Sequence, residues 1–158
     1  MGTEPVFEPD RVVAALNAAG VDYVIVGGLA VGAHGVVRAT RDLDIVPAAG
    51  QRNMDRLAGC LRALGGEHPI DRRLTGAALG RPVSFKVRTK HGEVQVVNRM
   101  KGVPSFDELQ RDQIHVEIAS DAVAPVCSLA HLRAMKRAAD RPRDRVDLAE
   151  LAELHGPG

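Results

Sequence analysis

An apolar run, Tyr23-Val24-Ile25-Val26, leads directly into Gly27-Gly28, and this junction constrains the fold more than any other segment. Four consecutive apolar residues that stop at a turn signal are typical of a buried strand. Apolar residues resume at Leu29 and stop at Gly35, which predicts a short helix directly after the strand. Glycine lacks a Cβ, so the backbone can make a tight turn there or leave room for a phosphate at the start of a helix. The glycine pair alone leaves both choices open.

A second predicted strand, residues 43–46, ends at a proline and has acidic residues at position 44 and directly before its start, at position 42. Side chains two positions apart on a strand point to the same side, so Asp42 and Asp44 project together. Neighbouring carboxylates repel one another and require a positive partner. Mg²⁺, which is bound by carboxylates together with substrate phosphates, is one such partner. The alternative is a salt bridge from Arg38 or Arg41.

The remaining periodicities predict an α/β (α+β) fold, with a mixed sheet flanked by helices. Helices are expected over 9–19, 29–34, 51–64, 105–109, from 128 and from 142, and strands over 23–26, 43–46, 83–88, 94–97, 114–118 and 122–126. Residues 69–81 are expected to form a loop with at most one short strand. We expect a single domain over residues 1–158, with the C-terminal helices, 128–155, in the same unit.

The composition supports a single domain, because 158 residues at 45% hydrophobic content can bury a core. A net charge of +1 does not favour binding to polyanions over the whole surface. Apolar stretches are too short to cross a membrane, and the acidic N-terminus does not resemble a signal peptide. Cys60 and Cys127 lack the spacing of metal ligands or disulfides. A cytoplasmic protein without membrane contact is therefore expected.

The segment 133–145 contains six basic and two acidic residues. Such a segment is most often a solvated helix face, and contact with phosphates is the alternative. The six histidines form no zinc pattern. His34, which follows the glycine turn, is expected to have a loop or core role rather than a catalytic one.

Two motifs together resemble a known family. The hydrophobic-Gly-Gly junction followed by Asp-hydrophobic-Asp-hydrophobic resembles the signature of the DNA polymerase β-like nucleotidyltransferase superfamily. Residues 132–139, then 141–144 and Asp147-Leu148, resemble the closing motif of its AbiEii-like group, which includes toxins of bacterial toxin–antitoxin and abortive-infection systems. The resemblance runs from about Val21 to the end of the chain and suggests a minimal, single-domain member.

The resemblance implies a site with a triphosphate cradle, a Mg²⁺-binding pair and a lysine that contacts nucleotide phosphate. Gly27 and Gly28 would form the cradle, Asp42 and Asp44 would bind Mg²⁺, and Lys136 would contact the phosphate. Asp144 would orient Lys136 or assist the acceptor. Arg38 and Thr40 either help to bind phosphate or fix the loop before the aspartates. Arg141 and Arg143 are either further phosphate contacts or, by a slight preference, surface charge.

Members of the superfamily usually carry a third carboxylate on a later strand, and Gln95 stands at the position that we align with it. An amide can coordinate a cation through its carbonyl oxygen, but it cannot accept a proton at neutral pH. Glu93 lies on the same strand face and can replace the acid if the strand shifts by two residues. Alternatively, Asp44 acts as the base and Gln95 as a positioning group.

The resemblance thus implies an enzyme that moves a nucleotide monophosphate from an NTP to a hydroxyl group, with Mg²⁺ as cofactor. RNA, particularly a tRNA end, or a protein hydroxyl is the expected acceptor, and a small molecule is the alternative. A toxin role with a cognate antitoxin protein as partner follows from the same resemblance. The competing hypothesis, which rests on Gln95, is a degenerate, non-catalytic module that binds nucleotide or a partner protein.

Overall fold

A computed structural model describes residues 6–67, 74–81 and 84–158, and its centre is a six-stranded mixed sheet. The strands are β1 (Tyr23–Val26), β2 (Asp42–Pro47), β3 (Ser84–Thr89), β4 (Gly92–Val97), β5 (Ile114–Ala119) and β6 (Ala122–Val126). Their order across the sheet is β3-β4-β2-β1-β6-β5. Parallel pairs join β2 to β4 and β1 to β6, while β1–β2 and the two outer hairpins are antiparallel. The mixed sheet predicted from the sequence is confirmed.

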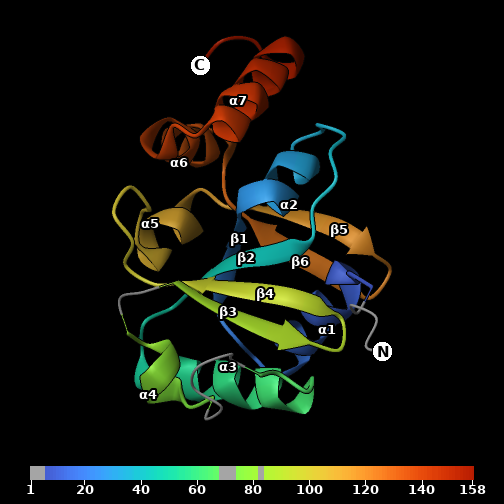
Figure 1. The fold of residues 1–158 in the computed structure, drawn as a ribbon, viewed down its shortest axis with the longest axis vertical. Helices are drawn as coiled ribbons and strands as arrows, with labels where there is room; N and C mark the ends of the chain where they lie inside the picture. Colours follow the sequence, from blue (N-terminus) through green and yellow to red (C-terminus); the bar gives the residue numbers. More distant parts are fainter. Residues whose placement is uncertain (1–5, 68–73, 82–83) are drawn as a thin grey trace.

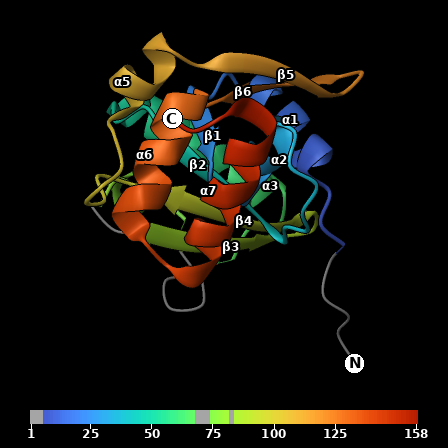
Figure 2. The ribbon, with the colours of Figure 1, turned by 90° about the horizontal axis from the view of Figure 1, so that it is seen from above.

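Helices cover the sheet on opposite sides. They are α1 (Pro9–Ala18), α2 (Gly27–Ala33), α3 (Gln51–Ala63), α4 (Gly76–Leu79), α5 (Phe106–Arg111), α6 (Leu129–Ala139) and α7 (Pro142–His155). Helices α3 and α4 lie below the sheet in Figure 1, and α2, α6 and α7 lie above it. Seen from above, α6 and α7 run side by side across the sheet (Figure 2).

The helix starts follow from their capping residues. The hydroxyl groups of Ser105 and Ser128 accept hydrogen bonds from backbone N–H groups in the first turns of α5 and α6. These bonds satisfy donors that the helix itself leaves free. Prolines occupy the first position of α1 and α7, where a missing N–H costs nothing. The predicted starts of these four helices are therefore confirmed to within one residue.

The core lies between the sheet and its helices. Strand β1 is buried along its whole length, and on β2 the buried Leu43 and Ile45 alternate with the half-buried aspartates. Leu132 of α6 and Leu151 of α7 belong to the same apolar cluster as these strands. The cysteines, Cys60 and Cys127, are free and buried. Among the described residues, no helix is long and apolar enough to cross a membrane.

The segment after α3 departs from expectation. Residues 76–79 form the short helix α4, where a loop with at most one strand was predicted. The hydroxyl group of Thr75 accepts a hydrogen bond from the N–H of Ala78 at 3.1 Å, and this cap starts a helix in a stretch of small residues. Positions 68–73 and 82–83 lie outside the described residues. The predicted start of the third strand, residue 83, is one of these positions, and β3 is described from Ser84.

Candidate active site

A cavity of about 420 Å³ opens beside the C-terminal end of β1, between the glycine turn, strand β2 and the corner that joins α6 to α7. Apart from the alternative acid Glu93, the residues assigned to the nucleotide and metal site from the sequence line it. These residues are Gly27, Gly28, Arg38, Thr40, Asp42, Asp44, Gln95, Lys136 and Asp144. Segments that are far apart in the chain thus meet in one place.

The glycine turn is packed against the aspartate strand. Gly27 has a φ of +74°, and a Cβ on it would overlap the carboxylate of Asp44. A Cβ on Gly28 would lie 2.9 Å from Oγ1 of Thr40. That hydroxyl donates a hydrogen bond of 3.2 Å to the carbonyl of Asp42. Both glycines are therefore required by the close approach of the site's own side chains, and Thr40 fixes the loop.

The two aspartates occupy different electrostatic surroundings. Oδ1 of Asp44 is buried and has no hydrogen-bond partner among the described residues. Burial raises the pKa of Asp44 to about 7, and the charge of Asp42 adds to the rise. The positive charges of Lys136, Arg143 and Arg141 act in the opposite direction but do not cancel it. A buried acceptor without a donor, next to a second carboxylate, is suited to binding a cation.

Magnesium fits this pair. Mg²⁺ usually takes one or two carboxylates from the protein and completes its shell with waters and substrate phosphates. Within the described ranges, no group of three or more His, Cys, Asp or Glu side chains is placed to hold a metal ion. A Mg²⁺ ion held by Asp42 and Asp44 would therefore take its remaining oxygen ligands from water and substrate.

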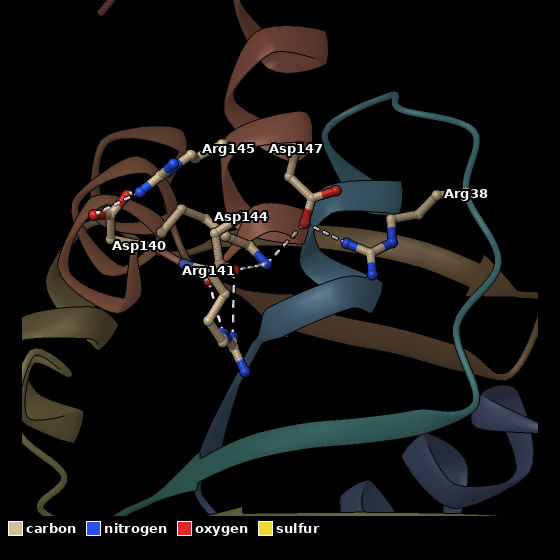
Figure 3. Close-up of polar contacts among 7 residues, drawn as sticks. Arg38, Asp140, Arg141, Asp144, Arg145 and Asp147 are labelled. Atoms are coloured by element: carbon tan, nitrogen blue, oxygen red, sulfur yellow. Dashed lines mark hydrogen bonds and ion pairs between the residues drawn. The ribbon is translucent and has the colours of Figure 1, made fainter.

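Lys136 is held at the back of the cavity by two buried carboxylates. Its Nζ lies 3.0 Å from Oδ1 of Asp144 and 2.9 Å from Oδ2 of Asp147. Asp147 also accepts a hydrogen bond from Arg38, which arrives from the loop between α2 and β2 (Figure 3). Arg38 is therefore tied to α7 and forms no salt bridge to the paired aspartates.

Our sequence reasoning missed Asp147 as a member of the site. It lies three positions after Asp144 on α7, so both carboxylates project from one face of the helix toward Lys136. Its place in the closing motif, at helical spacing from Asp144, was the available signal.

Asp144 is a fixed anion. Burial alone would raise its pKa, but hydrogen bonds from Arg141 and Lys136 outweigh burial and hold the pKa of Asp144 at about 2. The Nε of Arg141 lies 2.7 Å from Oδ2 of Asp144. Arg141 and Arg143 both line the cavity and are both exposed, so phosphate contact and surface charge stay open as their roles. The basic segment is not a simple solvated face, because Arg133 and Lys136 are buried.

Gln95 stands directly beside Asp44 in the parallel pair of β2 and β4, and Glu93 stands beside Asp42. The amide of Gln95 donates a hydrogen bond to the hydroxyl of Ser84 on β3. Glu93 is not among the residues that line the cavity. The position beside Asp44 on β4 is therefore occupied by an amide, without the two-residue shift that would bring in Glu93.

His34 lies outside this cavity. Its Nε2 is 2.8 Å from the carbonyl oxygen of Cys127, and its ring meets that of His155 edge to face, with centroids 6.4 Å apart. These contacts agree with the structural role expected for His34.

The amino-acid sequence matches no protein-family model and no curated protein sequence. Solved structures with the same fold do match. The lincosamide antibiotic adenylyltransferase LnuA, solved with lincomycin bound, superposes with a TM-score of 0.67 at 17% identity, over 96% of this chain and 99% of that one. ANT(2")-Ia, in complex with adenylyl-2"-tobramycin, gives a TM-score of 0.61 at 15% identity, over 91% and 85%.

A third similar structure is an antigenic nucleotidyltransferase-like protein from Paracoccidioides brasiliensis. It has a TM-score of 0.62 at 20% identity, and the alignment covers 98% of this chain and 80% of that chain. The protein therefore has the fold of these nucleotidyltransferase structures. The AbiEii-like group is not represented among these three structures.

Proposed function

We propose that this protein is a Mg²⁺-dependent nucleotidyltransferase, which moves a nucleotide monophosphate from an NTP to a hydroxyl group. One observation carries the proposal. A single cavity contains a carboxylate pair with an unpaired buried oxygen on Asp44 and, opposite it, the buried and firmly held cation of Lys136. This arrangement suits a metal-bound triphosphate, which needs a cation at the carboxylates and a positive charge at its phosphates.

Each residue has a role in this proposal. Asp42 and Asp44 would hold Mg²⁺, which when bound stabilises the charge that develops on the phosphate oxygens. Lys136 binds phosphate as a compact charge, and Asp144 and Asp147 keep its Nζ in place. Gly27 brings the backbone close enough for the triphosphate to reach the aspartates.

The transfer exchanges one phosphorus–oxygen bond for another. The acceptor hydroxyl oxygen bonds to the α-phosphorus, and the bond to the bridging oxygen breaks, so that pyrophosphate leaves. The hydroxyl proton needs a base. Asp44 is the proposed base, because its carboxylate lines the cavity and the neutral Gln95 cannot accept a proton.

A small hydroxyl compound is the acceptor that we propose first. RNA binding needs free basic side chains, whereas the basic segment at α6 and α7 is largely paired within the molecule. Arg133 donates to the carbonyl of Gly156, Arg141 pairs with Asp144, and Arg145 pairs with Asp140. The similar adenylyltransferase structures hold lincomycin and adenylyl-tobramycin. The RNA, tRNA and self-modification hypotheses, and with them the toxin and antitoxin roles, remain the other arms of the test.

The test follows labelled nucleotide from each of the four NTPs, with Mg²⁺, into three acceptor pools: lincosamide and aminoglycoside compounds, total tRNA, and the protein alone. The wild type is expected to label one pool, and the double variant Asp42→Asn/Asp44→Asn to label none. If both proteins label every pool equally weakly, the transferase proposal fails. The pool that becomes labelled identifies the acceptor class.

Gln95 favours a second candidate function, in which the site binds nucleotide without efficient turnover. Thermal unfolding separates this candidate from an empty scaffold, because a ligand that binds only the folded state raises the midpoint. A rise with NTP and Mg²⁺ in the wild type, absent in the Asp42→Asn/Asp44→Asn variant and without any labelling, would establish binding alone. No rise in either protein would exclude both candidates.

A further inference from the structure

Strand β5 is an edge of the sheet whose side chains remain accessible on both faces. None of its six residues is buried, and Ile114 is 38% exposed. Figure 2 shows β5 along the outer rim of the molecule, and no described element lies beyond it. An edge strand presents unpaired backbone N–H and C=O groups, to which another strand can add.

The opposite edge of the sheet is protected in two ways. Strand β3 projects Lys86 and Arg88, which would repel the same residues of another copy. In addition, the backbone of Glu67 forms two hydrogen bonds with that of Arg88, each 3.0 Å long, and so covers part of this edge. Strand β5 has neither protection, since its charged residues are one Glu and one His.

The sequence of β5 is symmetrical about its third residue. It reads Ile114-His115-Val116-Glu117-Ile118, so apolar residues and a pair of complementary polar residues repeat on each side of Val116. We propose that β5 pairs antiparallel with β5 of a second copy of this chain, with the two-fold axis at Val116, and that the two sheets join into one. This inference is independent of the proposed nucleotidyl transfer.

In this register each side chain meets a compatible one. Ile114 lies opposite Ile118 of the second copy, and Val116 lies opposite its own counterpart, all on one face. On the other face, His115 lies opposite Glu117 of the second copy, and this pair occurs twice. Cross-strand apolar pairs and opposite charges both stabilise antiparallel strands. A neutral imidazole keeps one N–H, so His115 can donate to the carboxylate in either protonation state.

Neighbouring registers are worse. An axis at His115 would place the two histidines opposite each other, and an axis at Glu117 would oppose two carboxylates. A slip by one residue would put isoleucines opposite polar side chains on both faces. The register shift of this strand lies between Glu117 and Ala119, so Ile118 falls at the β-bulge, whereas the charged pair and Val116 lie in the regular part.

Charge exchange on β5 tests the pairing, because His115 and Glu117 are exposed and can be changed without disturbing the core. Analytical ultracentrifugation of the full chain over a concentration series should show a monomer–dimer equilibrium. His115→Glu should weaken the dimer about tenfold or more, because two carboxylates then face each other in both copies of the pair. Glu117→Lys should also weaken it, because it removes the carboxylate that accepts from His115. The double variant His115→Glu/Glu117→Lys restores opposite charges and should recover the dimer. Asp121→Lys, at the exposed turn after β5, is the matched control and should have no effect.

A cross-link tests the position of the axis. Val116→Cys should form a disulfide between two copies under mild oxidation, since residues opposite each other on antiparallel strands lie within disulfide range. The natural cysteines are buried and should not interfere. Val123→Cys, on an exposed position of the neighbouring strand β6, should not cross-link. A monomer at every concentration, or a dimer that ignores both single charge reversals, would overturn the proposal.

Discussion

Gly27 lies so close to Asp44 that a Cβ on the glycine would overlap the carboxylate of the aspartate. The contact joins the first residue of α2 to the third residue of β2. It explains why an apolar strand stops at a glycine pair in this chain: the turn must make room for an acidic side chain that the next strand brings alongside. The glycine pair and the aspartate pair are therefore one structural unit.

Two glycines of α2 give a matched comparison. Gly27→Ala is expected to destabilise the protein by more than about 1 kcal/mol, because φ is positive there and the new methyl group displaces Asp44. Gly32→Ala, in the same helix with nothing within 4 Å of its would-be Cβ, should instead stabilise by up to about 1 kcal/mol. Chemical denaturation measures both effects. Equal effects in the two variants would contradict the packing described for Gly27.

The raised pKa of Asp44 predicts that the free energy of unfolding falls as pH rises. Its pKa is about 7 in the folded protein and near 3.8 when the chain is unfolded. Between these values the folded state binds more protons than the unfolded state, so the free energy of unfolding decreases as pH rises through this window. Above pH 7 the loss is complete, on the order of a few kcal/mol.

The measurement is the thermal midpoint at pH 5 and pH 8, without and with Mg²⁺. Asp44→Asn should be more stable than the wild type at pH 8 and gain less at pH 5, because an amide carries no charge to bury and only about a third of the window lies below pH 5. Mg²⁺ should raise the midpoint of the wild type at pH 8 and leave that of the variant unchanged. A stability difference that is the same at both pH values would mean that Asp44 is already ionised at pH 5.

The buried carboxylate of Asp147 predicts a large loss of stability when it is neutralised. Asp147→Asn removes one of two partners from Lys136 and leaves Arg38 unpaired, which is expected to cost about 3–5 kcal/mol. Nucleotide binding should weaken as well, because the Nζ of Lys136 is no longer fixed. Asp140→Asn removes an exposed partner of Arg145 and should leave the unfolding midpoint unchanged. Equal unfolding midpoints for the two variants would contradict the stabilising role of Asp147 as a partner of Lys136 and Arg38.

Local patterns explain which parts of this structure could be predicted. The apolar run of β1 and the alternation of aspartate with leucine and isoleucine on β2 depend only on neighbours in the chain. The serine caps of α5 and α6 are similarly local. For this reason, the strands, most helices and the shared side of Asp42 and Asp44 follow from the residues themselves.

The side of the cavity that α6 and α7 form depends on contacts between residues that are far apart in the chain. Arg38 and Asp147 are 109 positions apart, and no periodicity links them. Their contact requires the corner at Asp140, whose φ of +49° turns α7 so that Asp144 and Asp147 meet Lys136. The same corner places the exposed Arg141 and Arg143 beside the cavity. The position of Gln95 beside Asp44 likewise depends on strand register, which the resemblance suggested and the pairing of β2 with β4 displays.

Gln95 and Glu93 provide the last prediction, because they stand beside Asp44 and Asp42 in the same register and only Gln95 lines the cavity. Gln95→Glu places a third carboxylate in the site, so it should raise the rate of nucleotidyl transfer about 10²-fold if a missing base limits the reaction. The same change should lower the stability of the metal-free protein, because three carboxylates then repel one another. Glu93→Gln should leave the transfer rate unchanged.

The comparison needs transfer rates with Mg²⁺ and thermal midpoints without it, for the wild type and both variants. A loss of transfer in Glu93→Gln would show that Glu93, rather than Asp44, supplies the base, and that β4 shifts when substrate binds. An unchanged rate in Gln95→Glu, together with the expected loss of stability, would show that the new carboxylate reaches the site and that proton removal is not the limiting step. In that case, the positioning of the acceptor limits the reaction, and Gln95 acts through its hydrogen bond to Ser84.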